Sequence, residues 1–104
     1  MLKKWCGATV DMEKNLVSTD EGSVELTKNE IFILKVLLDR KNSIVGREEI
    51  IQKLWDDEKF VSDNTLTVNI NRLRKKLNTL QLGDFIETKV GQGYIAKEKE
   101  DLSC

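Results

Sequence analysis

An α+β fold is predicted for this chain, with a small N-terminal antiparallel sheet, three helices and a C-terminal β-hairpin. Short β-type runs alternate with polar turns over residues 1–26, and apolar residues recur at helical spacing over 27–80. Two glycines then separate β-type runs within 84–97. Three helices followed by a hairpin have the winged helix-turn-helix layout, in which the hairpin is the wing. At 104 residues the chain is expected to form one such domain, residues 1–104, with a polar tail at 98–104.

The first half of the chain is expected to run from strands into a deeply buried helix. Strands are predicted at Lys4–Ala8, Thr9–Met12, Asn15–Ser18 and Ser23–Leu26. Thr27 and Glu30 have the spacing of a capping box, and Leu26 with Ile31 has the spacing of a hydrophobic staple. The helix that follows, IFILKVLLDR, is apolar almost all round, so we expect it to be the most buried element.

A second, shorter helix is predicted after a two-residue strand, Ile44-Val45. Gly46 can cap this helix, which is expected to span Arg47–Leu54. Its inward-facing residues are Ile50, Ile51 and Leu54. The segment Trp55–Phe60 is predicted to be the connecting loop before the third helix.

The third helix, predicted over residues 62–80, carries one apolar stripe at three- and four-residue steps. The stripe consists of Leu66, Ile70, Leu73, Leu77 and Leu80. Ser62 is the expected N-cap, with Asp63 as the competing cap, and Val61 with Leu66 has staple spacing. The free N–H groups of this helix start suit a phosphate, so Thr65 is either a plain cap or a phosphate ligand.

The face opposite the stripe predicts nucleic-acid binding. At about 100° per residue it carries Asn64, Val68, Asn71, Arg72 and Lys75. The segment holds four cations, Arg72, Arg74, Lys75 and Lys76, and has no acid between Asn64 and Gly83. Amides, guanidinium groups and an exposed valine suit base edges in a major groove. A solvated cationic face is the alternative, which Val68 disfavours because an exposed valine gains nothing in water.

The composition argues against an enzyme, a metal centre or a bound cofactor. Histidine is absent, which removes the commonest general base and zinc ligand. The acids Asp56, Asp57 and Glu58 are interpreted as a solvated loop rather than a metal site. Cys6 and Cys104 stand near opposite ends, and no apolar run reaches membrane-spanning length, so a reduced, cytoplasmic setting is expected. The net charge is −1, but the charged residues are segregated along the chain. The cations of the 72–76 segment can therefore still form a basic face that binds a polyanion.

Several motifs together identify a family resemblance that covers essentially the whole chain. They are LTKNE, the Arg47-Glu48-Glu49-Ile50 helix start, Leu54-Trp55, NTLTVNINRLRKKL and IETKVGQGY. With these, the chain resembles the effector domain of OmpR/PhoB-type response regulators, the output half of bacterial two-component systems. WDDEKFVSDNTLTVN and ETKVGQGY look closest to the GraR/BceR type, which answers antimicrobial peptides and bacitracin in Gram-positive bacteria. The resemblance implies a receiver domain before this segment and a sensor kinase as its partner.

The resemblance also implies roles for individual residues. Positions matching Thr67, Val68 and Arg72 face bases, and those matching Thr65, Asn71 and Arg74 touch backbone phosphates. Trp55 matches a phosphate-contacting tryptophan, although a core or capping role is the alternative, and Arg74 has the alternative of pairing with an acid of the N-terminal sheet. The chain departs from the family where Asn64 replaces an arginine, Thr67 an acid, and Val90 a minor-groove arginine beside Lys89. The predicted DNA-binding residues are Trp55, Asn64, Thr65, Thr67, Val68, Asn71, Arg72, Arg74, Lys75, Lys89 and Gln92.

These observations predict sequence-specific binding to double-stranded DNA and regulation of transcription. The isolated domain is expected to be a monomer that pairs on direct-repeat sites, and the 55–61 segment matches one that contacts RNA polymerase in some relatives. Tyr94 is expected to pack under the wing. The alternative is a winged helix used for protein–protein contact, and a non-specific RNA or nucleoid binder is a third option.

Overall fold

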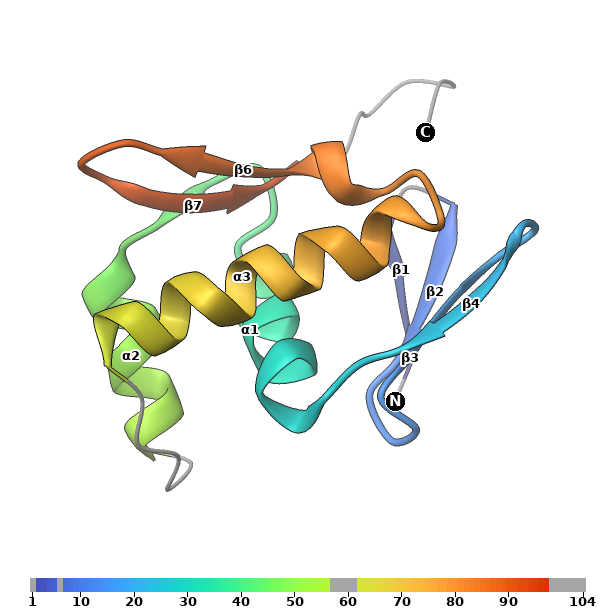
Figure 1. Cartoon of the computed structure of the whole chain (residues 1–104), viewed down its shortest axis with the longest axis horizontal. Coiled ribbons are helices and arrows are strands. Elements are labelled where there is room, and N and C mark those ends of the chain that lie inside the picture. The colour runs from blue at the N-terminus through green and yellow to red at the C-terminus, as the bar shows by residue number, and fades with distance from the viewer. Residues whose placement is uncertain (1, 6, 57–61, 98–104) are drawn as a thin grey trace.

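The computed structural model describes residues 2–5, 7–56 and 62–97, and it has the predicted α+β winged-helix architecture (Figure 1). The strands are β1 Leu2–Trp5, β2 Ala8–Asp11, β3 Leu16–Thr19, β4 Gly22–Glu25, β5 Ile44–Val45, β6 Ile86–Lys89 and β7 Gly93–Ala96. The helices are α1 Lys28–Asp39, α2 Arg47–Asp56 and α3 Asp63–Asn78, with a 3-10 turn, η1, at Gly83–Phe85. One antiparallel sheet has the order β1-β2-β3-β4 and the other the order β5-β7-β6.

The first two strands meet at a turn that the predicted boundaries missed. Trp5 pairs with Ala8, and Gly7 between them has φ +78°, a left-handed conformation that glycine adopts without strain. The predicted strand Lys4–Ala8 therefore runs across a turn, and its boundaries are wrong. The next three strands are each offset by one residue from their predicted spans. Trp5 is fully buried, and its indole N–H donates to the carbonyl of Lys97, which ties this sheet to the C-terminal segment.

Helix α1 lies at the centre of the hydrophobic core, as its sequence predicts. The Thr27 hydroxyl accepts from the Glu30 N–H at 3.2 Å, and a Glu30 carboxylate oxygen accepts from the Thr27 N–H at 2.9 Å, which confirms the capping box. The helix consequently begins at Lys28, three residues before the predicted apolar run. Leu26 and Ile31, the predicted staple, are both buried in the core cluster.

Helix α2 is longer than predicted. It continues past Leu54 through Trp55 and Asp56, so the tryptophan lies in its last turn and not in the connecting loop. Neither residue is a helix breaker, and the helical backbone has no reason to stop at the last inward-facing leucine. Residues 57–61, including the proposed staple residue Val61, lie outside the described part of the chain.

Helix α3 begins where its cap predicts and ends earlier than its apolar stripe suggests. The Ser62 hydroxyl accepts from the Thr65 N–H at 3.2 Å, which confirms Ser62 as the N-cap in place of Asp63. The helix ends at Asn78, and Gln81 follows with φ 61°. The Leu82 N–H then bonds to the Leu77 carbonyl at 2.9 Å, the pattern of a Schellman motif. Leu80 is buried beyond the helix end, so the predicted boundary at residue 80 is wrong.

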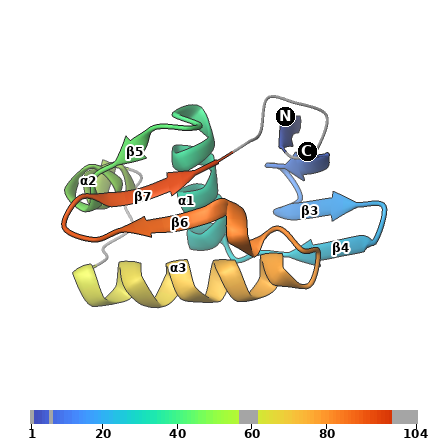
Figure 2. The same ribbon diagram turned by 90° about the horizontal axis from the view of Figure 1, so that it is seen from above.

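The wing is a hairpin of β6 and β7 to which β5 adds an edge strand (Figure 2). Phe85 belongs to η1 and Val90 to the turn, which shortens the predicted β-type runs. A Cβ on Gly93 would lie 2.1 Å from the Val45 carbonyl oxygen, so only glycine allows β5 and β7 to approach this closely. In Figure 1 the wing lies above α3 and its tip lies at the α2 end of the molecule, away from the N-terminal sheet.

Candidate nucleic-acid interface

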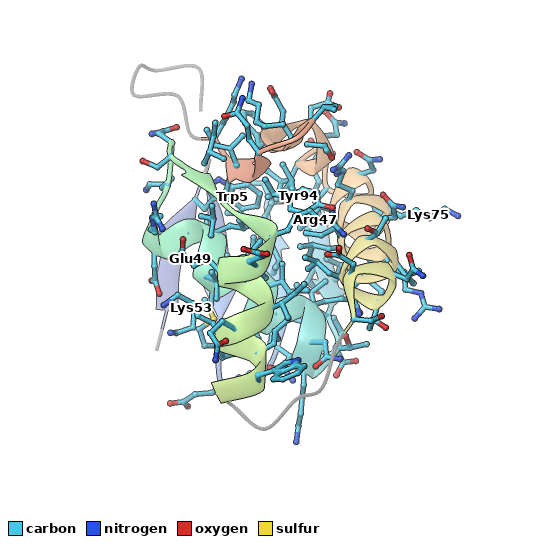
Figure 3. All side chains as sticks on the ribbon, turned by 90° about the vertical axis from the view of Figure 1, so that its left-hand side faces the viewer. Trp5, Arg47, Glu49, Lys53, Lys75 and Tyr94 are labelled. Atoms are coloured by element: carbon cyan, nitrogen blue, oxygen red, sulfur yellow. The ribbon has the colours of Figure 1, made fainter. Side chains whose placement is uncertain are left out.

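The orientation of α3 divides it into a core face and an outer face. Leu66, Leu73 and Leu77 are fully buried, whereas Val68 is 45% exposed on the opposite side. Asn64, Asn71, Arg72 and Lys75 are exposed with it. Figure 3 shows Lys75 pointing away from the body of the molecule. These five residues, called the outer face of α3 below, lie together as the helical periodicity predicts.

The four cations of this helix have different environments. Within the described residues, Arg72 and Lys75 form no hydrogen bond or ion pair, and both are exposed. Arg74 instead donates to the Thr88 hydroxyl of the wing strand β6, rather than pairing with an acid of the N-terminal sheet. Lys76 lies 2.7 Å from the carboxylate of Glu30, which is fully buried. Arg74 and Lys76 are therefore partly engaged inside the protein, whereas Arg72 and Lys75 are available to a ligand.

The start of α3 combines a cap with exposed polar groups. The hydroxyls of Ser62 and Thr65 lie 3.1 Å apart, so Thr65 bonds to the capping residue and is not itself the cap. Asn64 is exposed in the first turn, and the helix dipole places partial positive charge there. Asn69 is turned inward, where it donates to the Thr65 carbonyl at 2.9 Å. Backbone N–H groups at this end of the helix can donate to a phosphate oxygen.

Arg47, the first residue of α2, joins three elements and is absent from the predicted site. Its guanidinium donates to the Asp63 carboxylate at 3.1 Å, to the Asp63 carbonyl at 2.8 Å and to the Thr67 hydroxyl at 2.8 Å. It also donates to the Tyr94 hydroxyl in β7 (Figure 3). A cation at a helix N-terminus opposes the helix dipole. The position of Arg47 at the start of the predicted second helix could therefore have indicated, from the sequence alone, that it has an acidic partner elsewhere.

The wing tip carries one apolar residue and little free positive charge. Val90 is 90% exposed, and Gln92 is exposed beside it. Lys89 lies 3.2 Å from Glu87, and Lys97 lies 2.6 Å from the same carboxyl group. The ammonium groups of Lys97 and, to a smaller extent, Lys89 hold the pKa of Glu87 below its usual value. Tyr94 is buried under the wing, as predicted.

Two further features involve α2 and the turn of the wing. Trp55, at the end of α2, is 50% exposed. A hollow of about 330 Å³ is lined by Gly46, Arg47, Glu48, Gly91 and Gln92, which brings the start of α2 next to the wing tip. In the described part of the chain, no cluster of metal-ligating side chains is found, and no helix is long and apolar enough to cross a membrane.

Comparison with known proteins identifies relatives along most of the chain. A family model described as transcriptional regulatory protein, C terminal, matches residues 20–96. The sensory transduction protein BceR of Bacillus subtilis strain 168 is 74% identical over 99 residues, covering 95% of this chain and 43% of the relative. The response regulator protein GraR of Staphylococcus epidermidis is 53% identical over 94 residues, covering 90% of this chain and 42% of the relative. The chain thus spans less than half the length of these relatives.

Solved structures show the same architecture. The C-terminal domain of the nisin resistance regulator NsrR, described as a lantibiotic response regulator, superimposes with a TM-score of 0.85 at 34% identity, covering 93% of this chain and 98% of that one. The DNA-binding domain of the response regulator AdeR, solved in complex with an intercistronic region, has a TM-score of 0.77 at 21% identity, covering 93% and 99% of the two chains. This second likeness is one of fold.

Proposed function

The chain belongs to the family of C-terminal DNA-binding domains of OmpR/PhoB-type response regulators, and on that premise we propose that the outer face of α3 reads base edges in the major groove. Domains of this family bind DNA and regulate transcription, so the expectation of a DNA-binding, non-enzymatic domain is confirmed.

One observation supports the proposal most directly. On the outer face of α3, Val68, Asn71 and Arg72 are exposed together opposite the buried stripe. An arginine without an internal partner can form a bidentate pair with guanine, an amide can pair with adenine, and a valine can pack on a thymine methyl. Because Arg72 forms no hydrogen bond or ion pair with any residue that the structure describes, it gives up no such bond when it binds a base.

Backbone phosphates are proposed to be held around this reading face. Lys75 is exposed on the outer face, Thr65 and Asn64 lie at the positive end of the helix, and Trp55 is half-exposed at the end of α2. Arg74 is assigned the same role through the part of its guanidinium that does not bond to the wing. Such contacts set the register of the protein on the duplex and carry no sequence information themselves.

The wing is proposed to contact the DNA backbone or minor groove through its tip. Gln92 and Val90 are exposed there, and Lys89 is a nearby cation, although the negative charge of its partner Glu87 lowers the net positive charge at this site. The wing therefore contributes less positive charge than the outer face of α3. We assign it to positioning rather than to base preference.

The test is selection of binding sites from random DNA duplexes, followed by affinity measurements on the best site. Arg72→Ala should lower specific affinity by about 1–3 kcal/mol and relax the preference at one or two base pairs. Lys75→Ala is the matched control, and it should weaken binding to all sequences alike. If the wild-type protein enriches no sequence, base readout is refuted and a protein-docking role for this face is favoured.

The domain is further proposed to be a monomer that pairs on direct-repeat sites. Half-sites one helical turn apart, about 10–11 base pairs, would place two copies on the same face of the duplex. Insertion of five base pairs should rotate the copies apart and remove any cooperativity. A stable dimer in sedimentation without DNA, or cooperativity that survives the insertion, would contradict this arrangement.

The whole protein is proposed to be a cytoplasmic response regulator. It would regulate transcription of genes for resistance to antimicrobial peptides that act on the cell envelope. Support comes from BceR, GraR and the nisin resistance regulator NsrR, which are similar to this chain. A receiver domain and a sensor kinase would control it, and the 55–61 segment would contact RNA polymerase. Reporter expression with and without nisin or bacitracin, in cells with and without the full-length gene, tests the assignment.

A further inference from the structure

The contacts of Arg47 affect a residue of the recognition helix, Thr67. In Figure 3, Arg47 and Tyr94 lie close together beside the start of α3. The Arg47 guanidinium carbon lies 5.4 Å from the centre of the Tyr94 ring in β7, so the ring attracts the cation through a cation–π contact. The same guanidinium reaches the Thr67 hydroxyl at 2.8 Å and the Asp63 carbonyl at 2.8 Å.

The Thr67 hydroxyl is thereby occupied on both sides. It accepts from Arg47, and it donates to the carbonyl of Asp63 at 3.2 Å, one helical turn earlier. A hydroxyl has one proton and two lone pairs. With its proton already donated, Thr67 has none for the acceptors of guanine, adenine or thymine in the major groove. It retains its methyl group and one lone pair.

We propose that Arg47 is a positioning residue that sets base preference through Thr67. By holding the hydroxyl, Arg47 leaves the Thr67 methyl group to face the DNA next to Val68, so that this part of α3 selects thymine through methyl contacts. The inference rests on the proposed base readout by α3. It adds a residue outside the recognition helix that determines which chemical group the helix offers.

Two substitutions separate the methyl group from the hydroxyl, and the first of them is nearly isosteric. Thr67→Val replaces the hydroxyl by a second methyl, and Thr67→Ser removes the methyl and keeps the hydroxyl. In site selection, Thr67→Val should recover the wild-type site with its affinity within about twofold. Thr67→Ser should lose about fourfold in affinity, the effect of one buried methyl-sized group, and lose the preference for thymine at one base pair. The opposite pattern would overturn the proposal, because it would make the hydroxyl the reading group.

A double-mutant cycle then tests the role of Arg47. Arg47→Met should free the lone pair of the Thr67 hydroxyl that accepts from Arg47, so that the hydroxyl can accept from a base amino group and the preference at that same base pair broadens. In the Thr67→Val background, Arg47→Met should change the preference no further, because no hydroxyl remains to be released. Equal losses on all sequences in both backgrounds, with a salt dependence lowered by about one phosphate contact, would make Arg47 a phosphate ligand and overturn the proposal. A wild-type protein without sequence preference would overturn the base readout and this inference together.

Discussion

Replacing Lys76 by methionine should destabilise the domain far more than the same change at Lys75. The carboxylate of Glu30 is 0% exposed and lies 2.7 Å from the Lys76 ammonium group. Removing one partner of a buried ion pair costs about 3–5 kcal/mol, because the other charge stays buried without compensation. The Lys76 side chain is 35% exposed and partly hydrated, so we expect about 2–4 kcal/mol.

Lys75 is the matched control for this substitution. It precedes Lys76 on the same helix, is exposed, and forms no ion pair with any residue that the structure describes. Methionine has a helix propensity close to that of lysine, so Lys75→Met should change the free energy of unfolding by less than about 0.5 kcal/mol. For DNA binding we expect the opposite ranking, with the larger effect from Lys75→Met. This substitution should reduce the salt dependence of the affinity by an amount equal to about one phosphate contact.

Urea unfolding followed by circular dichroism gives both free energies of unfolding. Glu30→Gln completes a double-mutant cycle, because glutamine can still accept from the Thr27 N–H but carries no charge. In that background, Lys76→Met should cost less than about 1 kcal/mol. Equal destabilisation by the two lysine substitutions, or a coupling energy near zero, would refute the reasoning that the buried Glu30 carboxylate is stabilised by the Lys76 ammonium group.

Three further outcomes are expected. Leu73→Ala should destabilise the fold by about 2–4 kcal/mol in urea melts, because its fully buried side chain would leave a cavity; an effect no larger than that of a surface lysine would mean that α3 faces the other way. Replacing thymines by uracil one at a time should reveal at least one position that loses about 0.5–1.5 kcal/mol with wild-type protein, and Val68→Ala should abolish that sensitivity. Since Lys97 and then Lys89 lower the pKa of Glu87, their pairs stabilise the wing above the usual glutamate pKa and cease to do so as pH falls through the lowered value. Glu87→Gln should therefore flatten the acid side of the stability profile, and an unchanged profile would contradict the pairing.

Helix caps and turns can be predicted from the sequence where the interacting groups are close along the chain. The Thr27–Glu30 capping box and the Ser62 cap depend on groups three residues apart, and each marks a helix start correctly. Gly91 and Gly93 between two β-type runs predict a hairpin, because glycine adopts positive φ at low cost. The structure confirms this with φ values of 76° and 149° at these residues. The outer face of α3 follows from helical periodicity alone.

Boundaries were less predictable where packing or a turn decides them. The stripe of α3 continues to Leu80, which is buried, but the helix stops at Asn78 because its carbonyl groups are satisfied by a Schellman turn. The β-type pattern extends the predicted first strand through Gly7, because such a pattern does not show where the chain reverses.

Helix starts, the hairpin and the division of α3 into a buried stripe and a polar outer face can be predicted from local sequence, because these features follow from contacts within a few residues of the chain. Tertiary packing sets which polar groups remain free. It joined Lys76 to Glu30 across 46 positions and Arg47 to Thr67 across 20. Pairs so distant leave no periodic pattern, since only the packing of the helices and the wing brings their atoms together.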